Sequence, residues 1–160
     1  MTHDKQFIKD VQSHTNAKVF WYPVGGTWLY ENDWTINPKT KNLSIIASEK
    51  RETIGHKMRH DIINRFRSSF DVIHGRGYQY VEYKFESLSP YRFSTIIENS
   101  RIDDYFSEKL IDCLLTGTIP IYYGTNNIGN YFDTNGMLLI DNVDSFDNII
   151  PMLTEEYYES

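Results

Sequence analysis

Short apolar runs alternate along this chain with segments whose apolar residues recur every three or four positions. Continuous apolar runs are typical of strands in a sheet that is covered on both faces. They predict strands at residues 43–48 (LSIIAS), 70–75 (FDVIHG), 91–98 (YRFSTIIE), 119–123 (IPIYY) and 137–140 (MLLI). A further strand is predicted at residues 17–24 (AKVFWYPV), followed at residues 25–41 by a loop or hairpin rich in turn residues.

Helical spacing predicts helices between these strands. The apolar positions that repeat at this spacing are Met58, Ile62, Ile63 and Phe66 in one segment and Leu110, Ile111, Leu114 and Leu115 in another. Asp104 or Ser107 is placed to cap the second helix, and Gly117 lies just past its end. Residues 5–12 fit a short helix, and a final helix in residues 145–153 is expected to break or kink at Pro151.

Strands that alternate with helices imply parallel pairing through right-handed crossovers. We therefore expect an α/β fold with a Rossmann-like parallel sheet flanked by helices. No repeat, low-complexity tract or linker divides the chain, so residues 1–160 are expected to form one domain. Within it, residues 1–42 form a lead-in with an aromatic loop and residues 43–152 form the core. Ligands of such sheets bind at the carboxyl ends of the strands.

Composition narrows the function classes. A chain with 40% hydrophobic and 15% aromatic residues is globular, and a formal net charge of −6 argues against nucleic acid, whose binding needs a basic face. The single cysteine, Cys113, lies in an apolar helical run, where an inert buried thiol is common. The chain shows no apolar leader and no run of about 18 apolar residues. We expect no membrane span and a cytoplasmic location.

Polar residues of several kinds crowd the segment ENSRIDDYFSEKL, residues 98–110, around the start of one predicted helix. Unpaired N–H groups at a helix start favour phosphate, and Lys109 adds a cation there. Tyr105 offers a hydroxyl donor, and Glu108 can accept hydrogen bonds from a vicinal diol such as ribose. Asn99 offers donors and an acceptor from the strand end. Together these groups suit a nucleoside diphosphate.

The same residues also have a purely structural interpretation. A glutamate and a lysine are common on the solvated first turn of a helix, and an asparagine after a strand is often only a turn former. Tyr105 also fits a core aromatic whose hydroxyl reaches the surface. Residue chemistry leaves both interpretations open.

The order ENS…DYFSEKL…LLTGTIPIYYG, between residues 98 and 124, resembles the signature of the fucosyltransferases of glycosyltransferase family 10. In that family a Phe-Glu-Asn strand end leads through a Tyr to a Thr-Glu-Lys-Leu helix start, and then to a Val-Pro or Ile-Pro strand that ends in Gly. Here Ile97 stands in place of Phe and Ser107 in place of Thr. A weaker likeness in FDVIHGRG, GHKMRHDIINRF and MLLIDNVDSF extends it to roughly residues 43–152.

The resemblance implies the donor-binding, C-terminal half of a GT-B glycosyltransferase, with GDP-fucose as the donor substrate and no cofactor required. Lys109 and Tyr105 would hold the pyrophosphate, Glu108 the ribose, and Asn99 the diphosphate or sugar region. Arg59 occupies the place of an arginine that contacts the diphosphate, where a guanidinium gives bidentate contacts. An exposed helix arginine is the alternative for the same residue.

Glu98 matches the family's acidic strand-end residue and is the catalytic candidate of this chain. A carboxylate near the sugar would steady developing positive charge, but a structural hydrogen bond to a neighbouring loop explains the residue equally well. In the family the amino-terminal domain binds the acceptor and supplies the general base. We therefore expect the base, and the acceptor domain, to lie outside this chain.

Other residues are weaker candidates for a functional site. Arg76, in the turn HGRG at the ligand edge of its strand, is a candidate second ligand contact, although an exposed loop arginine is the preferred explanation. A packed aromatic hairpin is preferred over sugar stacking as the explanation of Trp21, Trp28 and Trp34. His56 and His60 are spaced i, i+4, but no carboxylate or cysteine completes a coordination set, so no metal site is predicted.

We therefore expect a donor-binding domain that resembles α-1,3-fucosyltransferases. In the implied reaction, an acceptor hydroxyl deprotonated by a base displaces GDP with inversion at the sugar carbon, as in protein glycosylation. The implied partners are a nucleotide sugar, a glycan acceptor and a separate acceptor-binding domain. Three alternatives stay open: a non-catalytic nucleotide-sugar-binding module, a transferase for another nucleotide sugar, and an interaction domain that has lost the ligand.

Overall fold

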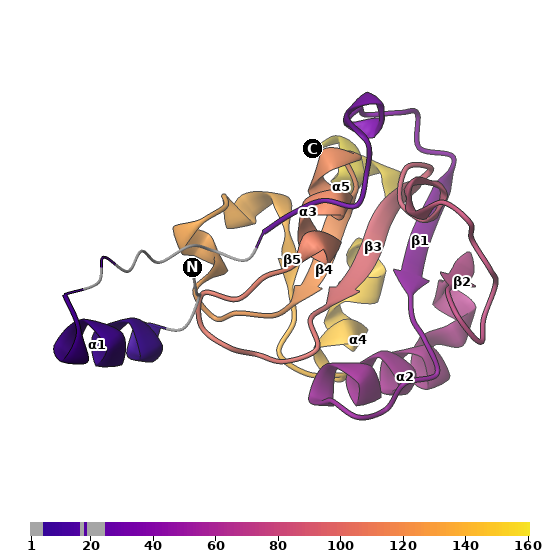
Figure 1. The fold of residues 1–160 in the computed structure, drawn as a ribbon. Helices are drawn as coiled ribbons and strands as arrows, with labels where there is room; N and C mark the ends of the chain where they lie inside the picture. The colour runs from indigo at the N-terminus through magenta and orange to yellow at the C-terminus, as the bar shows by residue number, and fades with distance from the viewer. Residues whose placement is uncertain (1–4, 17, 19–24) are drawn as a thin grey trace.

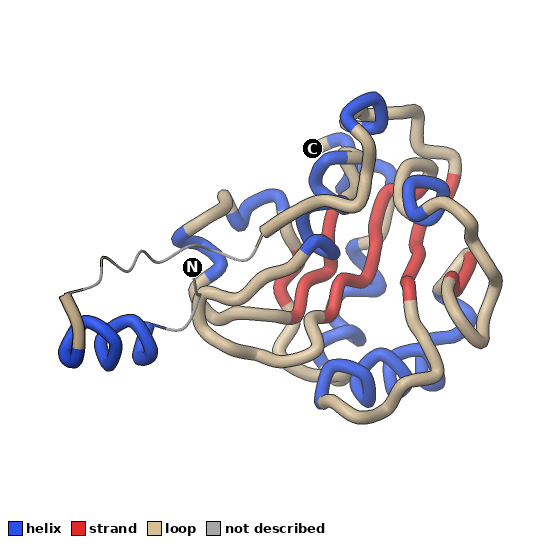
Figure 2. Tube along the Cα trace, in the orientation of Figure 1, coloured by secondary structure: helices blue, strands red, loops and turns tan. Residues whose placement is uncertain are grey.

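A five-stranded parallel sheet forms the centre of the computed structural model, which describes residues 5–16, 18 and 25–160 (Figures 1 and 2). The strand order is β2-β1-β3-β4-β5. The strands are β1 Lys41–Ile46, β2 Val72–His74, β3 Tyr91–Ile97, β4 Ile119–Tyr123 and β5 Leu138–Leu139. The helices are α1 Lys5–His14, α2 Ile54–Phe66, α3 Glu108–Leu115, α4 Ser145–Ile149 and α5 Glu155–Glu159. The predicted α/β fold with a Rossmann-like parallel sheet is confirmed.

Each face of the sheet has its own apolar layer, because side chains alternate between the two faces along a strand. On one face, Ile45 and Phe93 belong to a buried cluster that includes side chains of α2 and α4. On the other face, Ile96 and Tyr122 pack with Leu110 of α3. Figure 1 shows α3 in front of the sheet and α4 behind it. Both faces are covered, which explains the continuous apolar runs of the strands.

Most predicted elements are present. The strands predicted between residues 43 and 140 are all found, as are the helices that correspond to α1, α2 and α3, and Ser107 caps α3. The final helix does break near Pro151, since α4 ends at Ile149 and a 3₁₀ turn follows at Ile150–Met152, but α5 was not predicted. The strand predicted at residues 17–24 lies outside the described residues, apart from Lys18. In the described ranges, no helix is long and apolar enough to cross a membrane.

Residues 25–40, which we call the strap, connect to β1 by running along α3 (Figure 1). The strap contains a 3₁₀ turn at Glu31–Asp33 and no strand, so of the predicted loop or hairpin this described part is a loop. Trp28 and Trp34 are 74% and 48% exposed, which contradicts the packed aromatic hairpin preferred for them. Trp21 lies outside the described residues. Trp28 and Trp34 are exposed because the strap is held against α3 by its backbone and polar groups. Both indole rings therefore point into solvent.

Lys39 anchors the end of the strap at the amino edge of the sheet. Its Nζ donates to the carbonyl oxygens of Ser89 (2.9 Å) and Thr116 (2.8 Å) and to the hydroxyl of Thr118 (3.0 Å). Burial of the ammonium lowers the pKa of Lys39 to about 8. The protein therefore holds a partly buried cation where three neutral oxygens compensate for lost water.

The low pKa of Lys39 predicts a pH-dependent contribution to stability. The unfolded lysine, with a pKa of 10.5, binds its proton more tightly than the folded one. Burying Lys39 therefore costs no proton-linked stability above pH 10.5, where the lysine is neutral in both states. The free energy of unfolding falls as the pH is lowered from 10.5 to about 8, because the unfolded lysine takes up its proton first. Relative to Lys39→Met, the free energy of unfolding of the wild-type chain should rise by about 1–2 kcal/mol between pH 8 and pH 10.

Urea unfolding of both chains at each pH measures this difference and cancels the titration of the tyrosines and Cys113, which both chains share. A difference that stays constant across the range would contradict the buried, charged state assigned to Lys39.

Candidate functional site

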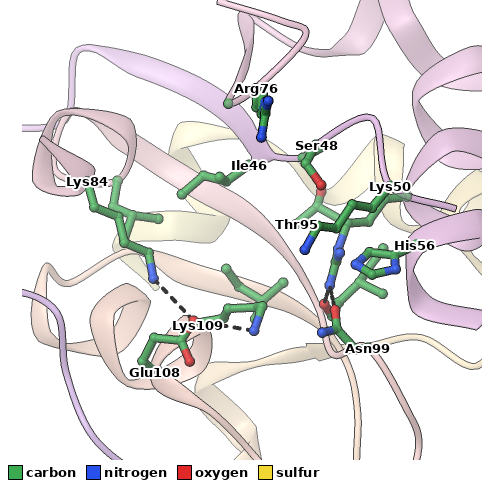
Figure 3. A pocket seen from close by; sticks show the side chains of 16 residues that line it. Ile46, Ser48, Lys50, His56, Arg76, Lys84, Thr95, Asn99, Glu108 and Lys109 are labelled. Carbon is green, nitrogen blue, oxygen red and sulfur yellow. Dashed lines mark hydrogen bonds and ion pairs between the residues drawn. The ribbon is translucent and has the colours of Figure 1, made fainter. Parts of the chain in front are cut away.

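A cavity of about 380 Å³ opens at the carboxyl ends of β1 and β3, next to the start of α3 (Figure 3). This volume lies in the usual range of small-molecule sites. The lining is unusually cationic, and the basic side chains that contribute to it are Lys50, Arg59, Arg76, Lys84 and Lys109. Glu108 is the carboxylate in the lining, and Ile46, Leu88 and Ile96 provide apolar surface. Such a cavity suits an anionic ligand that also has an apolar part.

Glu98 ties the end of β3 to the start of α3. Its side chain is 0% exposed, and its carboxylate accepts hydrogen bonds from the backbone N–H of Ser107 (2.8 Å) and from the Ser107 hydroxyl (2.7 Å). The Nζ of Lys109 lies 3.5 Å from Glu98 Oε2. A buried carboxylate is tolerated when such partners compensate for its lost hydration. Glu98 thereby fixes where Lys109 stands.

This arrangement changes the role expected of the α3 terminus. The N–H of Ser107 is occupied by Glu98, and the N–H of Lys109 contacts the Ser107 hydroxyl at 3.4 Å. The expectation that these N–H groups await a phosphate is therefore wrong, because a carboxylate of the protein and the capping hydroxyl already satisfy them. The cationic side chains around the cavity remain for a ligand.

Arg59 reaches the same strand end from α2. Its Nη2 donates to the carbonyl oxygen of Ile97 and to Oδ1 of Asn99, the latter at 2.8 Å. The side chain is 6% exposed, so the alternative of an exposed helix arginine is excluded. Burial lowers the pKa of the Arg59 guanidinium, and the charges of Glu98 and Glu108 oppose this shift. Two acidic groups thus support a buried cation at the cavity wall.

Gly55 allows α2 to approach β3 closely enough for this contact. A Cβ at Gly55 would lie 1.8 Å from the Glu98 carbonyl oxygen, and its N–H donates to the carbonyl oxygen of Asn99 at 3.1 Å. A side chain of any size would therefore push the first turn of α2 away from the strand end. The position of Arg59 depends on this glycine.

The electrostatic environment keeps Glu108 ionised. Burial by itself raises the pKa of Glu108, but the charges of Lys109 and Lys84 lower it below its usual value. The Oε1 atom of Glu108 lies 3.3 Å from Lys109 Nζ and 3.9 Å from Lys84 Nζ. An ionised carboxylate can only accept hydrogen bonds, which suits it to the hydroxyl groups of a sugar.

His56 adds a neutral polar group to the lining. Burial, followed by the charge of Arg59, lowers the pKa of His56, so the imidazole is uncharged at pH 7. Within the described residues, no three His, Cys, Asp or Glu side chains are grouped as a metal site requires.

The cavity brings together most of the predicted ligand-binding residues. Those in its lining are Arg59, Arg76, Asn99, Glu108 and Lys109 (Figure 3), with Arg76 exposed at the rim. Tyr105 is half-buried and is not part of the lining. Burial and the charge of Glu98 raise the pKa of Tyr105, so this hydroxyl stays protonated close to the site. The ligand-binding roles themselves stay predictions.

For Glu98, the structure shows the structural hydrogen bond to a neighbouring loop that the sequence left open. The carboxylate is enclosed and does not line the cavity. A catalytic role for Glu98 stays a prediction, and its geometry does not favour one.

Sequence reasoning missed Lys50, His56, Lys84 and Gly55 as parts of the site. A signal existed for Lys50, which follows a predicted strand at its carboxyl end. Lys84 begins a single 3₁₀ turn at Lys84–Ser87, which is too short to show a periodicity in the sequence, and no local pattern marks it. Its place depends on contacts with residues far away in the sequence.

Asp104 holds the loop between β3 and α3 in place. It adopts φ = 62°, a left-handed conformation that costs most non-glycine residues about 1 kcal/mol. Its N–H donates to Thr125 Oγ1 (3.0 Å) and Asn127 Oδ1 (2.9 Å), and its carboxylate accepts from Asn127 Nδ2 (2.7 Å) and Tyr131 Oη (2.5 Å). This loop leads directly into Tyr105 and Ser107.

The chain matches one protein family over most of its length. The family model described as "Glycosyltransferase family 10 (fucosyltransferase) C-term" matches residues 36–155. The match includes all five strands and every residue that lines the cavity.

Individual relatives are similar over shorter segments. An α-(1,3)-fucosyltransferase FucT of Helicobacter pylori is 35% identical over 70 residues, which cover 44% of this chain and 15% of the relative. The GDP-fucose protein O-fucosyltransferase 3 of Bos taurus is 39% identical over 51 residues, which cover 32% of this chain and 11% of the relative. The matched segments are thus small parts of much longer proteins.

Solved structures share the fold. A crystal structure of an α1,3-fucosyltransferase with GDP-fucose matches with a TM-score of 0.59 and 26% sequence identity. The match covers 79% of this chain and 39% of the solved chain. A crystal structure of an α1,3-fucosyltransferase with GDP matches with a TM-score of 0.60 and 25% sequence identity. This match covers 79% of the present chain and 37% of the solved chain.

Gly55→Ala should destabilise the protein by about 1–3 kcal/mol, because the methyl group collides with the Glu98 carbonyl and displaces α2. The change should also weaken ligand binding in the cavity by moving Arg59. Urea unfolding measures the first effect. Gly136→Ala is the matched control, since a Cβ there meets nothing within 4 Å. Equal stability of the two variants would contradict the close approach of α2.

Asp104→Ala should cost about 2–3 kcal/mol, because it keeps the left-handed backbone strain and leaves Asn127 and Tyr131 without their acceptor. Asp104→Asn should cost less than about 1 kcal/mol, since asparagine tolerates this conformation and keeps an acceptor oxygen. Thermal unfolding of the pair distinguishes them. If both variants lost the same stability, the carboxylate contacts would not be what holds the loop.

Proposed function

We propose that this chain, which belongs to glycosyltransferase family 10, the fucosyltransferases, binds the sugar donor GDP-fucose in the cavity at the carboxyl ends of β1 and β3. The observation that carries the proposal is the meeting of Arg59, Lys109 and Glu108 in one cavity. Two cations and one diol acceptor are the groups that a nucleoside diphosphate requires. Similar solved structures are α1,3-fucosyltransferases with GDP and with GDP-fucose, which supports this choice of ligand.

In the proposed complex the diphosphate lies between Arg59 and Lys109. Both cations are held in advance, Arg59 by Ile97 and Asn99, and Lys109 by the Glu98–Ser107 contact. Preorganised cations lose little conformational freedom on binding, and they stabilise the charge that develops on a departing diphosphate. Charge stabilisation on GDP is therefore the catalytic contribution proposed for this chain.

Glu108 is proposed to accept hydrogen bonds from the ribose hydroxyls, because its carboxylate is ionised and lies in the lining beside Lys109. Asn99 accepts a hydrogen bond from Arg59, and its side chain is proposed to contact the diphosphate or the sugar. Tyr105 is left with a supporting position near Lys109 rather than a direct contact, since it is not in the lining.

We base the proposal for the acceptor side of the reaction on family membership. An acceptor hydroxyl of a glycan would attack the sugar carbon and displace GDP with inversion, as the α-(1,3)-fucosyltransferases named above suggest. We assign the general base to another part of the enzyme, because Glu98 is enclosed and Glu108 is occupied by two lysines. The contribution of this chain is donor binding and leaving-group stabilisation.

The proposal predicts the effects of removing each cation on GDP affinity. Arg59→Ala and Lys109→Ala should each weaken GDP binding at least about ten-fold, since each removes a charge-assisted contact to the diphosphate. Calorimetric titration with GDP, GDP-fucose, GDP-mannose, UDP and UDP-glucose measures affinity and selectivity, and GDP-fucose should bind most tightly. Arg65→Ala is a matched control on the same helix, because Arg65 pairs with Asp144 and Asp147 outside the cavity.

Unchanged GDP affinity in both variants would remove the diphosphate assignment. Arg59→Lys should retain part of the affinity and tests whether a loss in Arg59→Ala comes from misfolding. Tight GDP-fucose binding with no release of GDP in the presence of glycan acceptors would favour a non-catalytic binding module.

A further inference from the structure

A carboxylate buried in the middle of an amphipathic helix is costly unless charged and polar partners compensate for its lost water. Asp112 is such a residue, with 0% exposure on α3. It accepts hydrogen bonds from the Thr27 hydroxyl (2.6 Å) and the Trp28 N–H (3.0 Å) of the strap. It also pairs with Lys84, whose Nζ lies 2.6 Å from Asp112 Oδ2.

Lys84 therefore has a fixed place in the cavity wall. Asp112 holds its ammonium from the α3 side, and Glu108 Oε1 lies 3.9 Å away on the cavity side. The ring of Trp28 lies 5.9 Å from the same ammonium, at a distance suited to a cation–π contact. Three segments distant in the sequence, the strap, the Lys84–Ser87 turn and α3, thus converge on one cation.

The order of groups along the cavity places Lys84 at one end of it. Figure 3 shows Asn99 and His56 on one side of Lys109 and Glu108, and Lys84 on the other side. If the diphosphate lies by Arg59 and Asn99 and the ribose by Glu108, the next part of the ligand is the nucleobase. The apolar side chains Ile46 and Leu88 in the lining offer a surface for a flat ring.

We infer that Lys84, positioned by Asp112 and Trp28, forms the nucleobase end of the cavity and selects a guanine ring. This inference rests on the proposed function and adds the recognition of the base to it. An ammonium has three donors. Lys84 Nζ lies 2.6 Å from Asp112 Oδ2 and 3.9 Å from Glu108 Oε1, and the second distance is too long for a hydrogen bond. Donors of the ammonium therefore remain for an acceptor of the ligand.

Guanine and adenine differ in what they present to such a donor. Guanine presents O6 and N7, which both accept, whereas adenine presents an amino group in place of O6. A fixed ammonium can therefore donate to both O6 and N7 of guanine, whereas in adenine it finds only N7 and meets an amino donor in place of O6. Asp112 acts as a positioning residue, because it contacts Lys84 and the strap and not the cavity.

Calorimetric titration of Lys84→Met with GDP, ADP and inorganic pyrophosphate tests the inference. GDP affinity should fall about ten-fold while pyrophosphate affinity stays within two-fold, because Lys84 is placed at the base and not at the diphosphate. The preference for GDP over ADP should fall by the same factor as the GDP affinity. Lys57→Met is the matched control, since Lys57 is an exposed lysine that lines a different hollow with Asp61 and Asp141.

Lys84→Met leaves Asp112 as a buried charge without its cation, which threatens folding. The double variant Lys84→Met with Asp112→Asn removes both charges and carries the same expectation. Asp112→Asn alone keeps an acceptor for Thr27 and Trp28, and it should lower GDP affinity without changing pyrophosphate affinity. Thermal unfolding of each variant confirms that the comparison is made on folded protein.

Equal losses of GDP and pyrophosphate affinity would overturn the inference and make Lys84 a diphosphate contact. Unchanged GDP affinity in the folded double variant would overturn it as well. If the wild-type chain bound pyrophosphate but showed no gain from the nucleoside of GDP, the base site would be refuted while a diphosphate site remained. No binding of either ligand by the wild-type chain would overturn the proposed function together with the inference.

Discussion

The enclosed carboxylate of Glu98 is the interaction on which the site depends. It stands at the end of a central strand, where water is excluded, and it is stabilised by the N–H and hydroxyl of Ser107 and by the ammonium of Lys109. These partners fix the start of α3 against β3. Because an enclosed anion also attracts Arg59, the same carboxylate supports two cations that would otherwise repel each other. One buried acid therefore builds the basic wall of the site.

The packing of α2 and α3 against β3 makes this electrostatic arrangement possible. Gly55 lets α2 approach the Glu98 backbone, and Asp104 fixes the loop that delivers Ser107. The chain as a whole carries a net charge of −6, yet the cavity collects cations from α2, α3 and the connections that follow β1 and β2. Such a separation of charge concentrates the attractive field for an anionic ligand at the cavity mouth while the rest of the surface repels it.

Local sequence signals were sufficient to predict the strands and helices, but they were insufficient to predict the site residues that act through long-range contacts. Runs rich in apolar residues specified β1 to β4, since burial on both faces of a sheet favours apolar side chains, and Ser107 was recognisable as a cap. Asn99, Glu108 and Lys109 could be predicted because they follow one strand and begin one helix. Gly55, Lys84 and Asp112 could not, because each acts through a contact with a residue remote in sequence. The strap was misjudged for the same reason: Asp112, and not an aromatic partner, holds Trp28.

The central claim is that a nucleoside diphosphate lies across this cavity in one direction, and a crystal structure of the chain with GDP tests it most directly. The account predicts the diphosphate between Arg59 and Lys109, the ribose hydroxyls within hydrogen-bonding distance of Glu108, and the guanine beside Lys84. A GDP molecule bound in the opposite direction, with its diphosphate at Lys84, or bound outside this cavity, would contradict the account.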